Sequence, residues 1–165
     1  MKLYGAAMAA NPRRVRIYLA EKGLEIEQVD FLPPHNELKS PEYLAKNPAG
    51  KIPLLELDDG TCISESAAII EYFEELFPAP PMIGTNPVER AKARAIERIV
   101  AEMFPVSRAY FVNHGPSFLL NLRGLTPVPA VAEALKPIID RNLGTLEALI
   151  GDNEFLAGPR PTVGD

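Results

Sequence analysis

The first half of the chain alternates between short strand-like runs and stretches in which apolar residues recur at helical spacing. Strand-like runs occur at residues 2–5, 27–31, 54–57 and 61–63. Helical spacing occurs at residues 12–22, 41–46 and 64–77. The last two strands flank Asp58-Asp59-Gly60, which is a strong turn signal. This order of elements predicts a mixed sheet with helices packed on it.

The first predicted helix has recognisable end signals. Asn11 before Pro12 is typical of an N-cap followed by proline at the first helical position, where the missing N–H has no cost. Gly23 is typical of the glycine that closes a helix. We therefore expect this helix to begin at Pro12, with Asn11 as its N-cap.

A proline-rich stretch separates this half from a second half that is helical only. Four of the ten residues from 78 to 87 are proline, so a stiff linker is predicted at residues 79–86. Long amphipathic patterns then predict helices at residues 87–114 and 130–150, joined by a connection at residues 115–129. Each helix contains one internal proline, Pro105 or Pro137, where a kink is expected. The predicted domains are residues 1–78 and residues 87–165.

The last residues have the spacing of a helix start. Thr162 and Asp165 are three residues apart, as in a capping box, and no helix follows them in this sequence. Two long amphipathic helices also need a further apolar partner. Both observations favour a C-terminal domain that is incomplete.

Composition narrows the range of functions. The chain has 165 residues and a net charge of −5, with its 17 basic residues scattered among 22 acidic ones, which argues against nucleic-acid binding. A single cysteine cannot form an internal disulfide, and no apolar stretch is long enough to span a membrane, so a soluble cytoplasmic protein is predicted. His35 and His114 lack the spacing of metal ligands, so no metal site is expected.

Four segments resemble the cytosolic glutathione transferase family, in the right order and at the right spacing. They are residues 11–23 (NPRRVRIYLAEKG), 41–55 (PEYLAKNPAGKIPLL), 64–72 (SESAAIIEY) and 155–165 (FLAGPRPTVGD). The resemblance, closest to bacterial nu- and theta-type members, implies a thioredoxin-like N-terminal domain of order βαβαββα that binds glutathione as co-substrate. It also implies an all-α glutathione transferase C-terminal domain with about three further helices after Asp165. Such proteins are usually homodimers, so a homodimer is predicted.

The resemblance assigns two parts of glutathione to particular residues. Pro53 resembles the family's cis-proline, and the backbone of Ile52 before it would pair with the cysteinyl part like an added strand. From the residues alone, an ordinary trans proline that opens a strand is the favoured alternative. Glu65 and Ser66 resemble the pair that binds the γ-glutamyl group, where the helix start suits the carboxylate and Glu65 suits the ammonium. A plain helix start is compatible with the same residues.

The glycine carboxylate of glutathione is assigned to lysines. Lys51 resembles a family lysine that reaches this group, and Lys39 lies where some members place another polar contact. For both residues the alternative is a solvated surface lysine, which is favoured for Lys39. His35 is displaced from the usual position and is not included in the site.

The thiol end departs from the family pattern. The loop from Gly5 to Asn11 contains no hydroxyl and no thiol, and the serine of theta-type members would fall at Ala10. Asn11 resembles the asparagine that nu-type members place at the sulfur, so it is the predicted catalytic residue, with a plain N-cap as the alternative. Tyr4 is expected to serve packing, and Cys62 is expected to be a small buried residue rather than a reactive thiol.

The electrophile pocket is expected between this loop and the first long helix of the second half. Four residues of that helix are assigned to it: Phe104, Ser107, Arg108 and Phe111. The predicted function is conjugation of glutathione to hydrophobic electrophiles, or glutathione-dependent reduction of peroxides and disulfides. A non-catalytic module that binds glutathione or dimerises is the alternative, and a maleylacetoacetate isomerase-like enzyme is a third possibility, although its serine-rich loop motif is absent.

Overall fold

The computed structural model describes residues 1–121 and 124–165, and of Phe118 and Leu119 it describes only the backbone. The chain forms two compact units, Met1–Pro80 and Pro81–Asp165.

The first unit is built on a four-stranded mixed sheet of order β2-β1-β3-β4. Its strands are β1 (Lys2–Gly5), β2 (Glu27–Asp30), β3 (Leu54–Glu56) and β4 (Cys62–Ser64). Strand β1 pairs with β2 in parallel and with β3 antiparallel, and β3 and β4 form the predicted hairpin. The sequence-based expectation of a mixed sheet is therefore confirmed.

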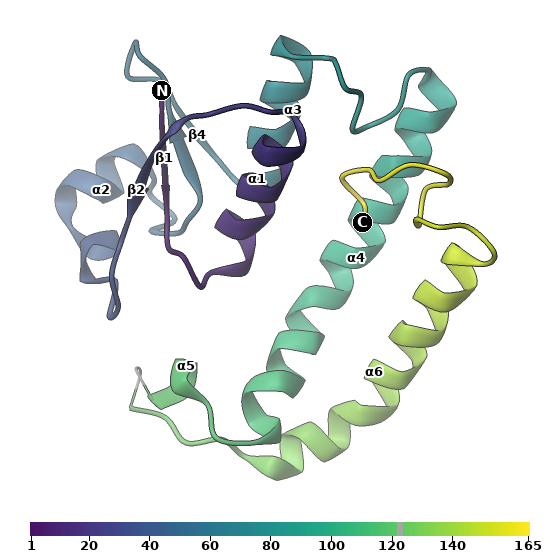
Figure 1. Cartoon of the computed structure of the whole chain (residues 1–165). Helices are drawn as coiled ribbons and strands as arrows, with labels where there is room; N and C mark the ends of the chain where they lie inside the picture. The colour runs from purple at the N-terminus through teal and green to yellow at the C-terminus, as the bar shows by residue number, and fades with distance from the viewer. Residues whose placement is uncertain (122–123) are drawn as a thin grey trace. The chain divides into compact units, whose positions relative to one another are not determined.

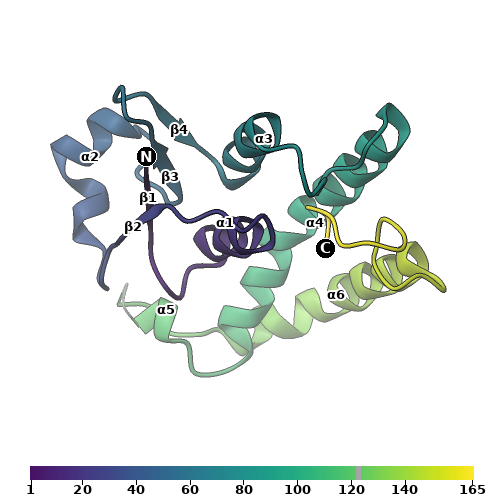
Figure 2. The same cartoon turned by 45° about the horizontal axis from the view of Figure 1, so that its top comes forward.

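Three α-helices and a short 3₁₀ helix accompany this sheet. They are α1 (Ala10–Glu21), η1 (Asn36–Lys39), α2 (Pro41–Lys46) and α3 (Ser66–Leu76). The strands lie between α2 on one side and α1 with α3 on the other (Figures 1 and 2). The fully buried side chains come from both strands and helices: Leu3, Val15, Leu54, Leu55, Ile69 and Phe73. Burying each of these large apolar side chains contributes about 1.5–3 kcal/mol.

Two predicted helix starts differ from the structure. Helix α1 begins at Ala10 with Ala9 as its N-cap, so Asn11 lies inside the first turn and is not the N-cap. Pro12 is still accommodated there because the first-turn N–H groups have no partner within the helix. Helix α3 begins at Ser66 rather than at Ser64, because Ser64 is the last residue of β4. The 3₁₀ helix η1 lies between the predicted strand at residues 27–31 and the predicted helix at residues 41–46, where no regular element was predicted.

A buried polar network joins α1 to the end of α3. The Lys22 side chain is fully buried and its ammonium forms an ion pair with Glu74 at 2.6 Å. The same ammonium donates to the Phe77 carbonyl at 2.7 Å and to the Pro80 carbonyl at 2.5 Å. Tyr18 donates its hydroxyl hydrogen to Glu74 at 2.6 Å, and burial together with this carboxylate raises the pKa of Tyr18 far above its usual value. All three ammonium donors are therefore satisfied away from water.

The second unit is helical. It contains α4 (Pro87–His114), α5 (Phe118–Asn121) and α6 (Pro129–Ile150), and α4 and α6 run side by side in opposite directions (Figure 1). Both long helices continue through their internal prolines, Pro105 and Pro137. Helix α5 falls in the stretch expected to be a plain connection, and residues 122 and 123 of that stretch lie outside the described residues.

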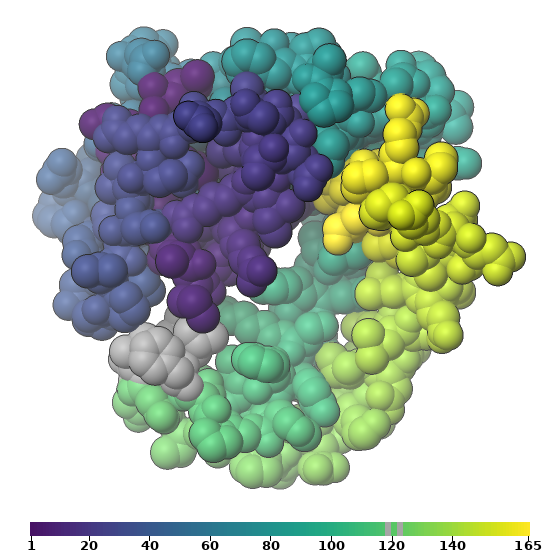
Figure 3. Space-filling model, viewed as in Figure 1, coloured from purple at the N-terminus to yellow at the C-terminus, as the bar shows by residue number. Residues whose placement is uncertain are grey.

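The C-terminal segment folds back along the second unit. The space-filling view shows it beside the end of α6 and the start of this unit (Figure 3). Val163 donates its N–H to the Met82 carbonyl at 2.9 Å. The Asp165 carboxylate accepts the backbone N–H of Thr162 at 2.8 Å, and Thr162 Oγ1 accepts the N–H of Gly164 at 3.2 Å. The side chain of Asp165 thus makes the backward contact that a capping box requires.

In the described part of the chain, no helix has both the length and the apolar character that crossing a membrane requires.

Candidate functional site

An open backbone edge lies at the start of β3. The peptide bond between Ile52 and Pro53 is cis, as the resemblance implies. Among the described residues, neither the N–H nor the C=O of Ile52 has a hydrogen-bond partner. An extended peptide can therefore pair with this residue as an added strand does at a sheet edge.

The peptide before this edge is fixed by two buried side chains. The Lys51 carbonyl accepts a hydrogen bond from the Tyr43 hydroxyl at 2.7 Å and another from Asn47 Nδ2 at 2.8 Å. Tyr43 and Asn47 are only 5% and 4% exposed, so water does not compete strongly for these donors. Burial raises the pKa of Tyr43 to about 12, and its hydroxyl therefore stays protonated and able to donate at neutral pH.

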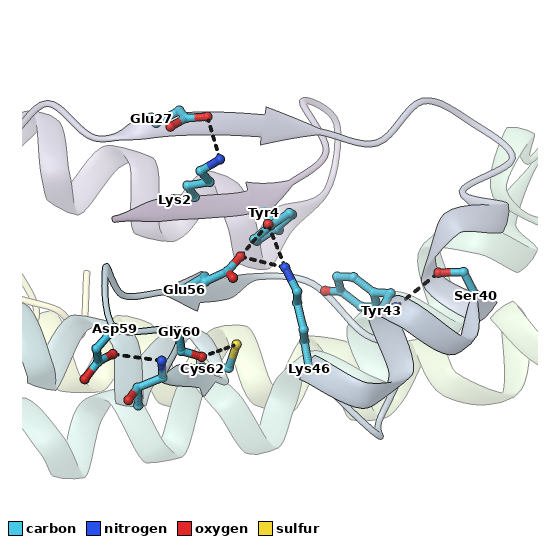
Figure 4. Close-up of polar contacts among 11 residues, drawn as sticks. Lys2, Tyr4, Glu27, Ser40, Tyr43, Lys46, Glu56, Asp59, Gly60 and Cys62 are labelled. Carbon is cyan, nitrogen blue, oxygen red and sulfur yellow. Dashed lines mark hydrogen bonds and ion pairs between the residues drawn. The ribbon is translucent and has the colours of Figure 1, made fainter.

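Helix α2, which carries Tyr43, is attached to the sheet by a polar cluster. Lys46 Nζ lies 2.8 Å from Glu56 Oε2 and 3.2 Å from the Tyr4 hydroxyl, and Tyr4 donates to Glu56 at 2.5 Å (Figure 4). The hydrogen bond to Glu56 and burial both raise the pKa of Tyr4, while the hydrogen bond from Lys46 lowers the pKa of Glu56. At the other end, Ser40 caps α2 by accepting the Tyr43 N–H at 3.1 Å.

Tyr4 is therefore committed to packing, as expected. Its hydroxyl is bonded to Glu56, and its ring stacks on Phe31 with centroids 6.0 Å apart and meets Tyr43 edge-on at 6.2 Å. A phenol with a raised pKa that already donates to a carboxylate is a poor partner for a thiolate.

The predicted γ-glutamyl residues lie at the start of α3. Glu65 is the N-cap residue and has a φ of 71°, an unusual conformation for a side-chain-bearing residue. No side chain caps this helix and its first turn has no acidic residue, so its N–H groups suit a carboxylate ligand. Ser66 is buried at 7% exposure, and its hydroxyl accepts a hydrogen bond from Arg14 Nη1 at 3.4 Å.

Helix α1 has a similar start. Its N-cap, Ala9, provides no side-chain hydrogen bond, and its first turn has no acidic residue. Asn11 is exposed in that first turn, with no hydrogen bond from its side chain within the described residues. Its amide can therefore donate to an anion that binds at the positive end of the helix. The contact between Arg14, in the second turn of α1, and Ser66, the first residue of α3, joins the N-terminal parts of the two uncapped helices.

The remaining polar candidates of the first unit differ in how far they are exposed. Lys39 ends η1 and Lys51 follows α2, and both are exposed. His35 is the N-cap of η1 with a φ of 63°, and its Nδ1 atom is buried without a partner among the described residues. Cys62 is half-buried rather than fully buried, and desolvation raises the pKa of its thiol, which disfavours the reactive thiolate. The described residues contain no group of three metal-ligating side chains.

The four residues assigned to the electrophile pocket lie on α4. Phe104 and Phe111 are 42% and 75% exposed and are seven residues apart, so they share one face of the helix. Arg108 is exposed, and the Ser107 hydroxyl donates to the Met103 carbonyl at 3.0 Å. Their role in binding an electrophile stays a prediction.

Three residues near the site were not selected from the sequence. Arg14 belongs to the segment of residues 11–23, from which only Asn11 was assigned to the site, and Tyr43 and Asn47 belong to the segment from which Lys51, Ile52 and Pro53 were assigned. The pairing of Asn47 with Pro48 ahead of a glycine was the one local sign that a side chain there organises the turn.

The fold is that of a thioredoxin-like domain followed by a helical domain, and known proteins share it. The family model for the glutathione S-transferase N-terminal domain matches residues 3–81. Maleylacetoacetate isomerase of Pseudomonas aeruginosa is 34% identical over the whole chain, which spans 76% of that protein. The chain spans about half the length of two further relatives. It belongs to the glutathione S-transferase family.

Solved structures agree with this assignment. A glutathione S-transferase domain-containing protein of Marinobacter aquaeolei VT8 is 34% identical, with a TM-score of 0.85 over the whole chain and 82% of that protein. A second structure, glutathione S-transferase-I bound with lactoylglutathione, has a TM-score of 0.82 at 27% identity and covers 99% of this chain and 77% of its own.

Proposed function

We propose that this protein binds glutathione along the open edge at Ile52 and activates its thiol at the start of α1 for addition to an electrophile. The observation that carries the proposal is the unpaired Ile52 backbone beside a cis-proline, together with two uncapped helix starts in the same unit. In this arrangement Glu65 and Ser66 bind the γ-glutamyl group and Lys51, with Lys39, binds the glycine carboxylate.

The thiol is activated without a protein hydroxyl. The positive end of α1 contributes about 0.3–1 kcal/mol toward the thiolate at an exposed site. A hydrogen bond to a charged group contributes about 1.5–3 kcal/mol, so the amide of Asn11 supplies the larger share. Because 1.36 kcal/mol corresponds to one pKa unit, Asn11 is expected to lower the pKa of the bound thiol by roughly one to two units.

A thiol titration tests this proposal. The ultraviolet absorbance of the glutathione thiolate is followed against pH with wild-type protein and with Asn11→Ala. A bound thiol pKa well below that of free glutathione, lost in Asn11→Ala, is the expected result. Tight binding with an unshifted pKa in the wild type would point instead to a non-catalytic binding module.

A complementary variant restores a hydroxyl. Ala10→Ser places a serine where theta-type members carry theirs, at the first residue of α1. We expect a lower bound-thiol pKa than in the wild type, and partial rescue when Ala10→Ser is combined with Asn11→Ala. Failure of the combined variant to recover any shift would argue that the thiol does not reach this end of α1.

Isomerisation of an activated alkene is the second candidate. The 34% identity to a maleylacetoacetate isomerase extends over the whole chain, which favours it despite the missing serine-rich loop. In such a reaction the thiolate adds to a carbon–carbon double bond conjugated to a carbonyl, the resulting single bond rotates, and elimination regenerates thiolate and alkene. A low thiol pKa serves both addition and elimination.

Glutathione consumption separates the two candidates. Conversion of maleylacetoacetate at catalytic glutathione, with no net loss of thiol, would support isomerisation. Stoichiometric thiol loss with aryl halides or activated alkenes would support conjugation, and oxidised glutathione formed from peroxides would support reduction. A homodimer stays a prediction, and light scattering at micromolar concentration that gives a monomer mass would contradict it.

A further inference from the structure

We infer that Tyr43 and Asn47 are positioning residues for glutathione, acting through the carbonyl group of Lys51. The inference rests on the proposed function, because it concerns the edge where the cysteinyl part of glutathione would pair. Neither side chain needs to touch glutathione for this role.

The argument begins with the number of hydrogen bonds on one oxygen. The Lys51 carbonyl accepts from Tyr43 at 2.7 Å and from Asn47 at 2.8 Å, so both of its lone pairs are used. Asn47 is itself held, because its Oδ1 accepts the Ala49 N–H at 3.2 Å. Tyr43 is held by the Ser40 cap and by an edge-on contact with Phe31 at 5.3 Å.

Peptide planarity transmits this constraint to the next residue. The Lys51 carbonyl and the Ile52 N–H belong to the same peptide unit, and in a trans peptide they point in opposite directions. Fixing the carbonyl toward α2 therefore fixes the Ile52 N–H away from α2. That N–H has no hydrogen-bond partner among the described residues, so it is available to a ligand in a defined direction.

The two hydrogen bonds from Tyr43 and Asn47 to the Lys51 carbonyl, here called the clasp, are hard to break because both donors are buried. The two donors are nearly inaccessible to water, and leaving either of them unpaired would cost the desolvation energy of a buried polar group. Rotation of the Lys51–Ile52 peptide would break both hydrogen bonds together. The chain therefore holds the pairing edge ready before glutathione arrives, which reduces the ordering cost of binding.

Two variants remove one donor each with little change of shape. Tyr43→Phe deletes only the hydroxyl, and Asn47→Asp replaces the donor Nδ2 by oxygen while it keeps the acceptor for the Ala49 N–H. Tyr18→Phe is the matched control, because it also deletes one buried tyrosine hydroxyl but one that is bonded to Glu74. Binding is measured by calorimetry with S-methylglutathione, whose blocked thiol makes the affinity independent of thiolate formation.

We expect Tyr43→Phe and Asn47→Asp to raise the Kd roughly threefold to tenfold, about the effect of one hydrogen bond, while Tyr18→Phe binds like the wild type. Glutathione turnover should show the loss in KM more than in kcat, and the amide resonance of Ile52 should shift in both variants but not in the control. If one variant does not fold, the other gives the same comparison.

Three results would count against the inference. Wild-type affinity in both variants, with an unmoved Ile52 amide resonance, would show that the clasp serves stability alone and would leave the proposed function standing. Absence of S-methylglutathione binding by the wild-type chain would overturn the proposed function and the inference together. An equal loss of affinity in Tyr18→Phe would also count against a specific role for the clasp.

Discussion

Breaking the buried ion pair between Lys22 and Glu74 should strongly destabilise the first unit. The ammonium has no exposed surface and its three donors go to Glu74, to the Phe77 carbonyl and to the Pro80 carbonyl. Glu74→Ala would leave this cation with the two carbonyl dipoles and the Tyr18 ring, whose centroid lies 5.6 Å away, but with no carboxylate. It would also leave the Tyr18 hydroxyl without its acceptor.

The expected loss is large for a single substitution. Removing one partner of a buried pair costs about 3–5 kcal/mol, because the remaining charge stays buried without compensation. At about 2–4 °C per kcal/mol for a chain of this size, the midpoint of thermal unfolding should fall by roughly 6–20 °C.

Thermal unfolding followed by far-ultraviolet circular dichroism measures the effect. Lys136→Met is the matched control, because Lys136 and Asp140 form an ion pair at a similar distance, 2.8 Å, with side chains 57% and 59% exposed. An exposed pair of this kind contributes little to stability because water and salt screen it, so the control should lower the midpoint by no more than about 2 °C.

A double variant separates pairing from mere burial. Lys22→Met combined with Glu74→Leu removes both charges, and replacing a buried ion pair by apolar residues is often nearly neutral. The double variant should therefore be more stable than Glu74→Ala. A loss in Glu74→Ala no larger than that in Lys136→Met would refute the reasoning, because it would mean that water reaches the ammonium.

Three further predictions concern single positions. The pKa of Glu56 is lowered by Lys46, so the carboxylate contributes stability above its unfolded pKa, and this contribution is lost as pH falls through the folded pKa. The stability difference between wild type and Glu56→Gln, measured by urea unfolding, should thus be present at neutral pH and shrink progressively as pH falls below about 4; a difference that stays undiminished in strong acid would contradict it. Gly84→Ala should lower the free energy of unfolding by roughly 1–2 kcal/mol because of the positive φ of 96°, and further because the new Cβ would lie 2.5 Å from Glu89 Cβ. The control Gly144→Ala, in α6, places a Cβ with nothing within 4 Å and should raise the free energy of unfolding by about 0.5–1 kcal/mol. Equal effects of the two substitutions in urea unfolding would contradict this prediction. Glu65→Gly should raise the unfolding midpoint by relieving roughly 1–3 kcal/mol of backbone strain, yet weaken glutathione binding in calorimetry; unchanged affinity would remove Glu65 from the site.

The order of helices and strands in the first unit could be predicted from the sequence, because each of them is indicated by the preferences of neighbouring residues. The turn at Asp58-Asp59-Gly60 and the short helix opened by Pro41 depend on the preferences of a few adjacent residues. Helix α1 shows where this fails, since Asn11 has the preference of an N-cap but lies two residues inside the helix from the actual N-cap, Ala9. Alanines at positions 9 and 10 are strong helix formers, and nothing local marks the point where the chain leaves the turn after β1.

The site was less readable because its geometry depends on contacts between distant residues. The sequence assigned Ile52, Pro53 and Ser66 to the site as a prediction, but nothing in it indicated that Glu65 has a positive φ, because a glutamate in that conformation is held there by its surroundings. The clasp on the Lys51 carbonyl was also not predicted, because the partner of the Tyr43 hydroxyl is a backbone atom. Every residue has a backbone carbonyl, so the residue type does not indicate which carbonyl a side chain will bond.

The position of β1 in the sheet has a consequence for synthesis on the ribosome. This strand is made before the other three strands of its sheet, yet it lies between β2 and β3. Its pairing with β3 joins Tyr4 to Leu54, about 50 residues later. At roughly 5–20 residues per second, the strand therefore waits several seconds with one edge unpaired. During that interval the unpaired edge of β1 is a template on which another strand can pair, and a chaperone that shields β1 would raise the yield of folded protein.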